Sequence, residues 1–502
     1  MWETKRTAAK NGLARGLARV PTSAFVALGA LAWFGLHLCF PVAGFGEVDQ
    51  ARDARDSITW HARGEVALDD FSYRLRTSPL YLRALKYLLD HGLRIARLPS
   101  VMNGFSTVMG SLCLVGLFYL CQRLSSARVA AVATLIYAFT PGFWLCSSYG
   151  MPTIPACACL ILGALSFARA LESRGKFAAP GLLLLALVSC WFAFTLKADL
   201  ALSSGVFVAV ILRRSLTAPN RKRAVIELGL AGVIVAAATG LTIAFSRVVT
   251  AGMPVAEPVA STGEFLGRWH QQFPFQLSLL FESKNNAPLT HAIGSLWFGV
   301  SLLALLHGLV RDREARARVL GVAIWALPSI VFWGITPGNS ARHNVAAMAP
   351  LAFAATAFLF DIAGEKSRPY LLVAAVMACS YLDTSGDGTV VPSFNIVRGS
   401  RRLQRSSDDL HSVVRDFMHQ PAPKKAVVDS DFFNPYSTFE AWAAATKPTL
   451  SETSGYDDGP DRSTRILRTN SPTAARRFAA QMRAEGRVVC SLAYHFCDVP
   501  DR

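Results

Sequence analysis

Charged side chains are scarce in this chain. Only 17% of its 502 residues are Asp, Glu, Lys or Arg, whereas 52% are hydrophobic and the mean hydropathy is +0.33. Soluble proteins carry about a quarter charged residues. The apolar residues also recur in runs of roughly 18 to 22, the length at which a helix crosses the hydrocarbon of a bilayer. The composition therefore excludes a large soluble core and predicts a polytopic membrane protein.

Zinc-binding cysteine spacing is also absent. Eight of the ten cysteines lie in or beside apolar runs, where a cysteine is a small buried hydrophobe. Cys490 and Cys497 lie instead in a polar tail, and a disulfide between them is open if that tail is outside the cytoplasm. The excess of 51 Lys and Arg over 34 Asp and Glu lies in short clusters between apolar runs, which favours membrane topology over nucleic-acid binding.

The apolar runs predict about eleven spans. They cover residues 21–40, 100–121, 128–145, 153–171, 180–196, 200–212, 224–245, 290–310, 319–335, 345–360 and 370–382. The first run has no small-residue cleavage site behind it, which indicates an uncleaved span. The sixth run is short and could instead form a re-entrant hairpin with the fifth.

Basic residues alternate between the turns. Arginines and lysines gather in every second turn, at Arg123, Arg128, Arg169, Arg174, Lys176, Arg213, Arg214, Arg221, Lys222, Arg223, Arg311, Arg313, Arg316, Arg318, Lys366 and Arg368. By the positive-inside rule these turns and the amino terminus are cytoplasmic. The sequence thus predicts a multi-pass protein of the inner (cytoplasmic) membrane. Its tail would be periplasmic or extracellular.

The predicted fold class is an all-α polytopic membrane domain, residues 1–383, followed by a small α/β soluble domain, residues 384–502. The tail alternates strand-like segments, residues 425–433 and 487–496, with a helix-like segment, residues 473–486. In the first outside loop, residues 79–98 predict an interfacial helix. Its apolar stripe would be Leu82, Leu85, Leu88, Leu89 and Leu93.

An acidic cluster directly follows the first span, with Glu47, Asp49, Asp53 and Asp56. Carboxylates at the mouth of a helical bundle suit a general base or a metal ligand near the membrane surface. Acidic residues are equally common in a solvated loop, so chemistry alone leaves both interpretations open.

Four segments in order resemble the GT-C glycosyltransferases that use polyprenyl-phosphate sugars, in the branch of the protein O-mannosyltransferases and lipid A aminoarabinose transferases. They are VDQA (residues 48–51), TSPLYLRAL (77–85), TLKADL (195–200) and SARHNVAAMAPL (340–351). The resemblance covers the membrane part. It implies sugar transfer, with inversion, from a polyprenyl-phosphate donor to a lipid, glycan or protein acceptor at the outer face.

The same resemblance assigns roles to residues. Asp49 would be the catalytic base that takes the proton of the acceptor hydroxyl or amine, with Glu47 and Asp53 as supporting acidic residues. The phosphate that leaves needs cationic partners. Lys197 and Arg342, the only basic residues in their short outside turns, and the adjacent His343 would bind it.

This chain departs from the family at two places. Gln50 follows Asp49 where the family has Glu, and the turn SSYGMPTIP (residues 147–155) has no carboxylate. We therefore predict no metal site, and a divalent cation stays open as a cofactor.

Other classes stay open. A transporter or flippase would carry ionisable residues within its spans. A polysaccharide polymerase or ligase usually has its long functional loop late in the chain. A non-catalytic scaffold of the same fold would also lack the second carboxylate.

Overall fold

The computed structural model describes two groups of residues. In the helical part these are residues 22–42, 50, 53–54, 57–58, 60–61, 78–94, 97–173, 175, 177–217, 220–250, 295–335, 341–363 and 370. Beyond them it describes residues 382–384, 390–392, 425–429, 457–458, 464–468, 477, 480–486, 488–491 and 496–498.

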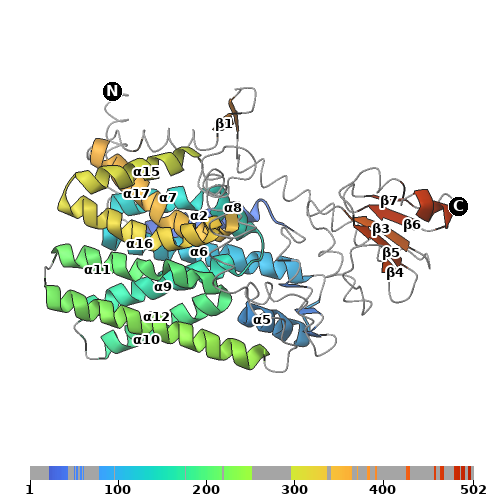
Figure 1. Ribbon diagram of the computed structural model, residues 1–502, viewed down its shortest axis with the longest axis horizontal. Helices are drawn as coiled ribbons and strands as arrows, with labels where there is room; N and C mark the ends of the chain where they lie inside the picture. The colour runs from blue at the N-terminus through green and yellow to red at the C-terminus, as the bar shows by residue number, and fades with distance from the viewer. Residues whose placement is uncertain are drawn as a thin grey trace, which may run out of the picture.

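The helical part is a bundle of helices packed side by side, most of them joined by short turns (Figure 1). Its elements are α2 (Thr22–Leu38), α5 (Pro79–Asp90), α6 (Leu98–Leu124), α7 (Ala127–Ala138), α8 (Pro141–Ser148), α9 (Thr153–Glu172), α10 (Ala178–Leu196), η2 (Ala198–Ser204), α11 (Gly205–Thr217), α12 (Arg221–Thr250), α15 (Ser295–Val310), α16 (Arg313–Ile335), η3 (Ala341–Asn344) and α17 (Val345–Ala363).

Within the described residues, six helices are long and apolar enough to cross a membrane, namely α6, α9, α10, α12, α16 and α17. The bent pair of α7 and α8, which turn by 61° at their junction, makes a seventh candidate. The prediction of a polytopic helical membrane protein is confirmed. The count differs from eleven because α2, α11 and α15 are shorter, and because the expected last span, 370–382, lies mostly outside the described residues.

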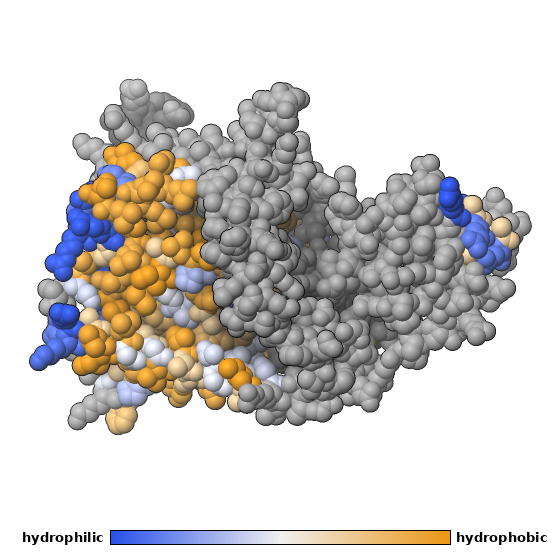
Figure 2. Space-filling model, viewed as in Figure 1, coloured by the Kyte–Doolittle hydropathy of each residue, from blue (hydrophilic) through white to orange (hydrophobic). Residues whose placement is uncertain are grey.

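A broad apolar surface covers the visible described face of the bundle, with hydrophilic residues at its edge (Figure 2). α12 contributes much of it, since Val225, Ile226, Val233 and Ile243 are all exposed. Exposed side chains of this kind would be unfavourable in water, but they match a hydrocarbon environment. α9 and α17 are by contrast the most buried of the candidate spans.

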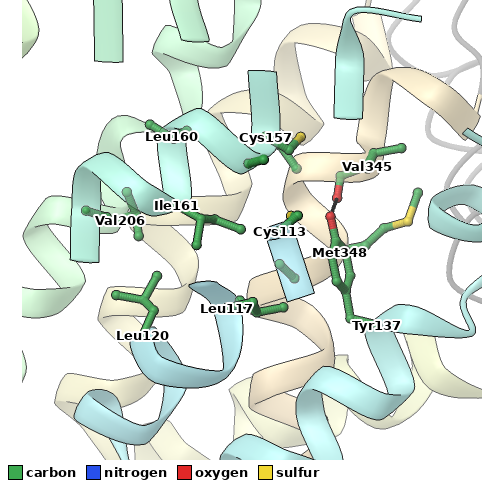
Figure 3. Close-up of a cluster of buried hydrophobic side chains, with 14 of the residues drawn as sticks. Cys113, Leu117, Leu120, Tyr137, Cys157, Leu160, Ile161, Val206, Val345 and Met348 are labelled. Atoms are coloured by element: carbon green, nitrogen blue, oxygen red, sulfur yellow. Dashed lines mark hydrogen bonds between the residues drawn. The ribbon is translucent and has the colours of Figure 1, made fainter. Parts of the chain in front are cut away.

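The core lies where α6, α7, α9, α11 and α17 meet (Figure 3). Cys113 and Leu117 of α6 pack there with Cys157 of α9, and all three are buried. The one polar group among the labelled side chains is the hydroxyl of Tyr137, which donates to the carbonyl oxygen of Val345 at 3.2 Å. That bond satisfies a buried polar group and ties α7 to the start of α17.

Glycine allows α11 to approach α16 closely. A Cβ atom on Gly205 would lie 2.1 Å from the carbonyl oxygen of Ile324. At that distance the two atoms would overlap. The backbone of α11 can therefore begin directly against α16 only because residue 205 has no side chain.

Ion pairs gather at one end of the bundle, and all of them except Arg223–Glu227, which lies within α12, join different helices or turns. They are Arg123 with Glu172, Arg213 with Glu314, Arg214 and Arg223 with Glu227, and Arg311 and Arg318 with Asp361. These residues belong to the turns in which the sequence concentrates its arginines. We call this end of the bundle the arginine-rich end.

The expected interfacial helix is present as α5. The Ser78 hydroxyl caps it by accepting the backbone N–H of Tyr81 at 3.1 Å. The buried stripe consists of Tyr81, Leu82, Leu85 and Leu89. The prediction was wrong for Leu88, which is exposed because it lies on the helix about 20° beyond Tyr81, at the edge of the stripe.

The carboxyl-terminal residues form a mixed five-stranded sheet in the order β4 (Asp457–Asp458), β5 (Thr464–Arg468), β3 (Lys425–Asp429), β6 (Val488–Ser491) and β7 (Phe496–Asp498). β3 pairs in parallel with β5 and β6, and the two edge strands are antiparallel to their neighbours. A separate antiparallel pair joins β1 (Leu382–Thr384) and β2 (Val390–Pro392). Helical residues 480–484 include the buried Met482. The expected α/β character of the tail is confirmed.

The register of β6 and β7 places Cys490 directly opposite Cys497. Cβ atoms of opposed residues in an antiparallel pair are about 4.5–5.5 Å apart, close to the separation that a disulfide requires. We therefore expect these two cysteines to be oxidised to a disulfide in the native protein.

Both cysteines lie in one tryptic peptide, residues 488–502. Mass spectrometry of protein alkylated without reduction should find this peptide unalkylated and two hydrogens lighter than its dithiol form. The same sample reduced before alkylation is the control. Alkylation of both thiols without reduction would contradict the pairing.

Candidate functional site

A polar cluster lies at the end of the bundle opposite the arginine-rich end. The carboxyl ends of α10 and α16 reach this end. η2 follows α10 directly, and η3 is the next described element after α16. α6, α9 and α17 begin there. The turns between these elements bring together residues that are far apart in the sequence. We call this end of the bundle the site end.

Lys197 lies at the end of α10, where the backbone becomes extended and the helix stops. Its ammonium is 3.1 Å from the Oδ1 atom of Asp199, the second residue of η2. Each of the two side chains is only 14% exposed. Since a charge this far removed from water needs a partner, the pairing accounts for the position of both residues.

Trp333, near the end of α16, completes the cluster. Its indole Nε1–H donates to the Oδ2 atom of Asp199 at 2.8 Å. The ammonium of Lys197 lies 5.3 Å from the centre of the same ring. The two oxygens of Asp199 therefore have different partners, and Trp333 contributes both a hydrogen bond and a cation–π contact.

His343 joins this cluster from η3. Its ring stacks on Trp333, with the ring centres 3.8 Å apart and the planes 15° apart. The His343 side chain is 7% exposed and the neighbouring Asn344 is fully buried. Two residues predicted to bind the donor phosphate, Lys197 and His343, are thus brought together through an intervening tryptophan.

The cluster is suited to an anion. An ammonium has three N–H donors, and the bond with Asp199 uses one of them. In a site that is largely shielded from water, a cation attracts a phosphate oxygen more strongly than it would in bulk solvent. Arg342 is in η3, one residue before His343, and its side chain lies outside the described residues.

Within the acidic loop, residues 47–56, the structure describes Gln50, Asp53 and Ala54. Asp53 is 6% exposed. Burial raises the pKa of Tyr81 well above its usual range, and the negative charge of Asp53 raises it further. Tyr81 therefore stays protonated, and its hydroxyl donates to the carbonyl oxygen of Gly150 at 3.0 Å. Glu47, Asp49 and Asp56 lie outside the described residues.

Asn103 of α6 joins this loop to the bundle. It accepts hydrogen bonds from Gln50 Nε2 at 2.6 Å and from the backbone N–H of Gly150 at 2.7 Å. Its own Nδ2 donates to the carbonyl oxygen of Val42 at 2.7 Å. The Ser78 hydroxyl similarly donates to the Thr195 carbonyl oxygen at 3.0 Å, which fixes the start of α5 beside the end of α10.

Sequence reasoning missed Asp199, Trp333 and Asn103. Asp199 lies within the TLKADL segment, two residues after Lys197, so its pairing with that lysine could have been predicted from the sequence. Trp333 belongs to an apolar run and Asn103 is a single polar residue in a span. No pattern in the sequence identifies either one. Among the described residues, no three His, Cys, Asp or Glu side chains come close enough to hold a metal ion.

No protein-family model and no curated protein matches this chain. Its structure is similar to that of ArnT from Cupriavidus metallidurans bound to undecaprenyl phosphate. The TM-score is 0.48 and the identity is 14%, over 94% of this chain and 90% of that one. The apo state of ArnT gives a TM-score of 0.49 at 13% identity, over 96% and 90%.

An oligosaccharyltransferase of Archaeoglobus fulgidus, in complex with zinc and sulfate, is also similar. The TM-score is 0.46 at 14% identity, over 83% of this chain and 61% of that one. Both proteins are members of the GT-C superfamily, which the order of motifs in this sequence resembles. At these identities and TM-scores, we base the function on the residues of this chain.

The bond between Trp333 and Asp199 yields a stability prediction. Trp333→Phe removes the indole N–H and leaves a carboxylate oxygen unpaired in a mostly buried site. We expect a loss of about 1.5–3 kcal/mol in the free energy of unfolding, the usual worth of a hydrogen bond to a charged group. The measurement is equilibrium unfolding of the purified protein in detergent.

Trp191→Phe is the matched control. Within the described part of the chain the indole nitrogen of Trp191 is buried and has no hydrogen-bond partner. That change removes the same atoms without breaking a bond, so it should cost clearly less. Equal losses for the two variants would show that ring size and not the hydrogen bond to Asp199 determines the effect.

Proposed function

We propose that this protein is a membrane glycosyltransferase, which transfers a sugar from a polyprenyl-phosphate donor to an acceptor at the site end of the bundle. The observation that carries the proposal is the cluster of Lys197, Asp199, Trp333 and His343, in which a lysine paired with a carboxylate is shielded from water at the site end. The order of segments in the sequence supports it independently. ArnT, which has been solved with undecaprenyl phosphate, has a similar overall structure.

In the proposed reaction Asp49 is the general base. It accepts the proton of the acceptor hydroxyl or amine while the oxygen or nitrogen attacks the anomeric carbon of the sugar. The bond between that carbon and the phosphate oxygen breaks, and its electron pair stays on the lipid phosphate. The configuration of the anomeric carbon is inverted, because attack occurs on the face opposite the leaving group.

The basic side chains of the site stabilise the leaving group. Lys197 and Arg342 neutralise the phosphate as its negative charge increases, and His343 borders the same place. This use of fixed charges in a shielded site lowers the energy of the transition state without rearrangement of solvent. Glu47 and Asp53 support the acidic side of the site. Donor lipid and acceptor both approach from the membrane surface next to α5.

We also propose an orientation of the protein in the membrane and a division of the chain into two domains. The arginine-rich end faces the cytoplasm of a cell with an inner membrane, and the site end faces the periplasm or exterior. Residues 1–383 carry out the transfer. Residues 384–502 form a separate soluble domain on the same side as the site.

A transporter or flippase is less compatible with the charges. In the described helices the Asp, Glu, Lys and Arg side chains lie at the two ends of the bundle. Transporters of this size have charged residues or interrupted helices near the middle of the membrane. Charges confined to the ends suit an enzyme that works at one membrane surface.

Two substitutions test the proposed chemistry. Asp49→Asn should lower kcat by about 10²- to 10⁴-fold, the usual contribution of a general base. Lys197→Met should lower kcat/KM for the donor by roughly ten- to a hundredfold, because a charge-assisted bond to the departing phosphate is lost. The measurement is transfer of labelled sugar from a polyprenyl-phosphate donor in membrane preparations.

Asp90→Asn is the control, since Asp90 is an exposed carboxylate on α5 that pairs with His61 and Lys86. Its activity should equal that of the unmodified protein. Full activity of Asp49→Asn would remove Asp49 from the mechanism. An unchanged kcat/KM in Lys197→Met would remove Lys197 from stabilisation of the leaving phosphate.

The proposed orientation is tested separately. Alkaline phosphatase fused after Thr384 should be active, since that enzyme folds only in an oxidising compartment, and a fusion within the turn after Arg214 should be inactive. The opposite pattern would reverse the orientation and place the site end in the cytoplasm.

A further inference from the structure

The hydrogen bonds around Asn103 determine which atoms of its side-chain amide are oxygen and nitrogen. The backbone N–H of Gly150 can only donate, so the atom 2.7 Å from it is the oxygen of Asn103. The carbonyl of Val42 can only accept, so the atom 2.7 Å from it is the nitrogen. Two backbone groups thus fix the amide without any reference to other side chains.

That orientation decides what residue 50 must be. The atom of residue 50 that lies 2.6 Å from the Asn103 oxygen has to be a donor. The amide nitrogen of Gln50 meets this requirement, whereas an ionised carboxylate has only acceptor oxygens. Rotation of the Asn103 amide to suit a carboxylate would break its bonds with both Gly150 and Val42.

The surroundings resist such a rotation. Gln50 is completely buried and Asn103 is 5% exposed. A Cβ atom on Gly150 would lie 2.2 Å from the Cβ of Met102, so the turn at Gly150 is pressed against α6 and has little room to move. The carbonyl oxygen of Gly150 also accepts the Tyr81 hydroxyl, which holds the turn from the side of α5.

We propose that Gln50 is a positioning residue whose uncharged amide anchors the acidic loop to α6 through Asn103. Position 50 thus has an anchoring role in this chain, and no carboxylate is needed there for catalysis. Residue 49 is one peptide unit away, about 3.8 Å between Cα atoms, so anchoring residue 50 restricts where the backbone of Asp49 can lie. The catalytic part of this inference rests on the proposed function. The structural part stands without it.

Residue 50 is therefore required to be a hydrogen-bond donor, which explains why it is Gln in this chain and not Glu. In Gln50→Glu an ionised carboxylate would face the oxygen of Asn103, and two acceptors in contact repel each other. A protonated carboxyl group has one O–H donor and can restore the bond. The effect of this substitution should therefore depend on pH.

Three titratable groups of described residues surround this network. Asp53 is three residues away in the same segment, Tyr81 reaches the Gly150 turn from α5, and Tyr149 belongs to that turn. α6 contributes only neutral side chains here, Asn103, Ser106 and Thr107. The negative charge of Asp53 and the burial both favour the protonated form of a glutamate at position 50.

The experiment compares Gln50→Glu with the unmodified protein between pH 5.5 and pH 8. At pH 8 we expect kcat/KM for sugar transfer to fall by roughly tenfold, the effect of one lost buried hydrogen bond. The ratio of variant to unmodified activity should recover severalfold at pH 5.5. The thermal unfolding temperature in detergent, measured on the same samples, should show the same trend.

Gln50→Met is the matched control, because it removes the donor at similar size and adds no ionisable group. Its ratio to the unmodified protein should be lower than one and independent of pH. Activity of Gln50→Glu at or above the unmodified level at pH 8 would overturn the proposal and indicate a catalytic place for a carboxylate. A pH-independent unfolding difference would overturn the structural part.

The unfolding measurement separates this inference from the proposed function. If the unmodified protein transfers no sugar from any polyprenyl-phosphate donor, the proposed function fails. The pH-dependent unfolding of Gln50→Glu would then still test the anchor between Gln50 and Asn103.

Discussion

Asn103 makes three hydrogen bonds with three separate parts of the chain, and the site end depends on them. Val42 follows the first span, Gln50 belongs to the acidic loop, and Gly150 is in the turn before α9. A buried polar side chain that lost these partners would carry a large desolvation cost. The three segments therefore keep their positions together, and α5 joins them through the Tyr81 hydroxyl.

The same cost of burying polar groups separates the two ends of the bundle. Charges cannot remain in the middle of the membrane, so they collect at the helix ends. At the arginine-rich end they pair with each other across neighbouring helices, for example Arg318 with Asp361. At the site end Lys197 and Asp199 pair beneath an aromatic stack of Trp333 and His343. The first arrangement holds helices together, and the second is the proposed site for the donor phosphate.

Several features could be predicted because they depend on local pattern. Apolar runs identified the spans, and the Ser-Pro start with helical spacing identified α5. The turn positions of Lys197 and His343 placed both residues at one end of the bundle. Other features depend on contacts between distant segments. Trp333 and Asn103 look like ordinary residues of apolar helices, and only packing shows that one bonds Asp199 and the other bonds Gln50.

The sequence by itself determined that the chain is a membrane protein of many helices with an α/β tail, and which turns share a side. Hydropathy and charge act locally along the chain, and the bilayer converts them directly into spans and orientation. Only the tertiary structure decided which side chains meet at the site end. It also decided that residue 50 must donate a hydrogen bond, because the direction of the Asn103 amide is set by the backbone groups of Val42 and Gly150, far from residue 50 in the sequence.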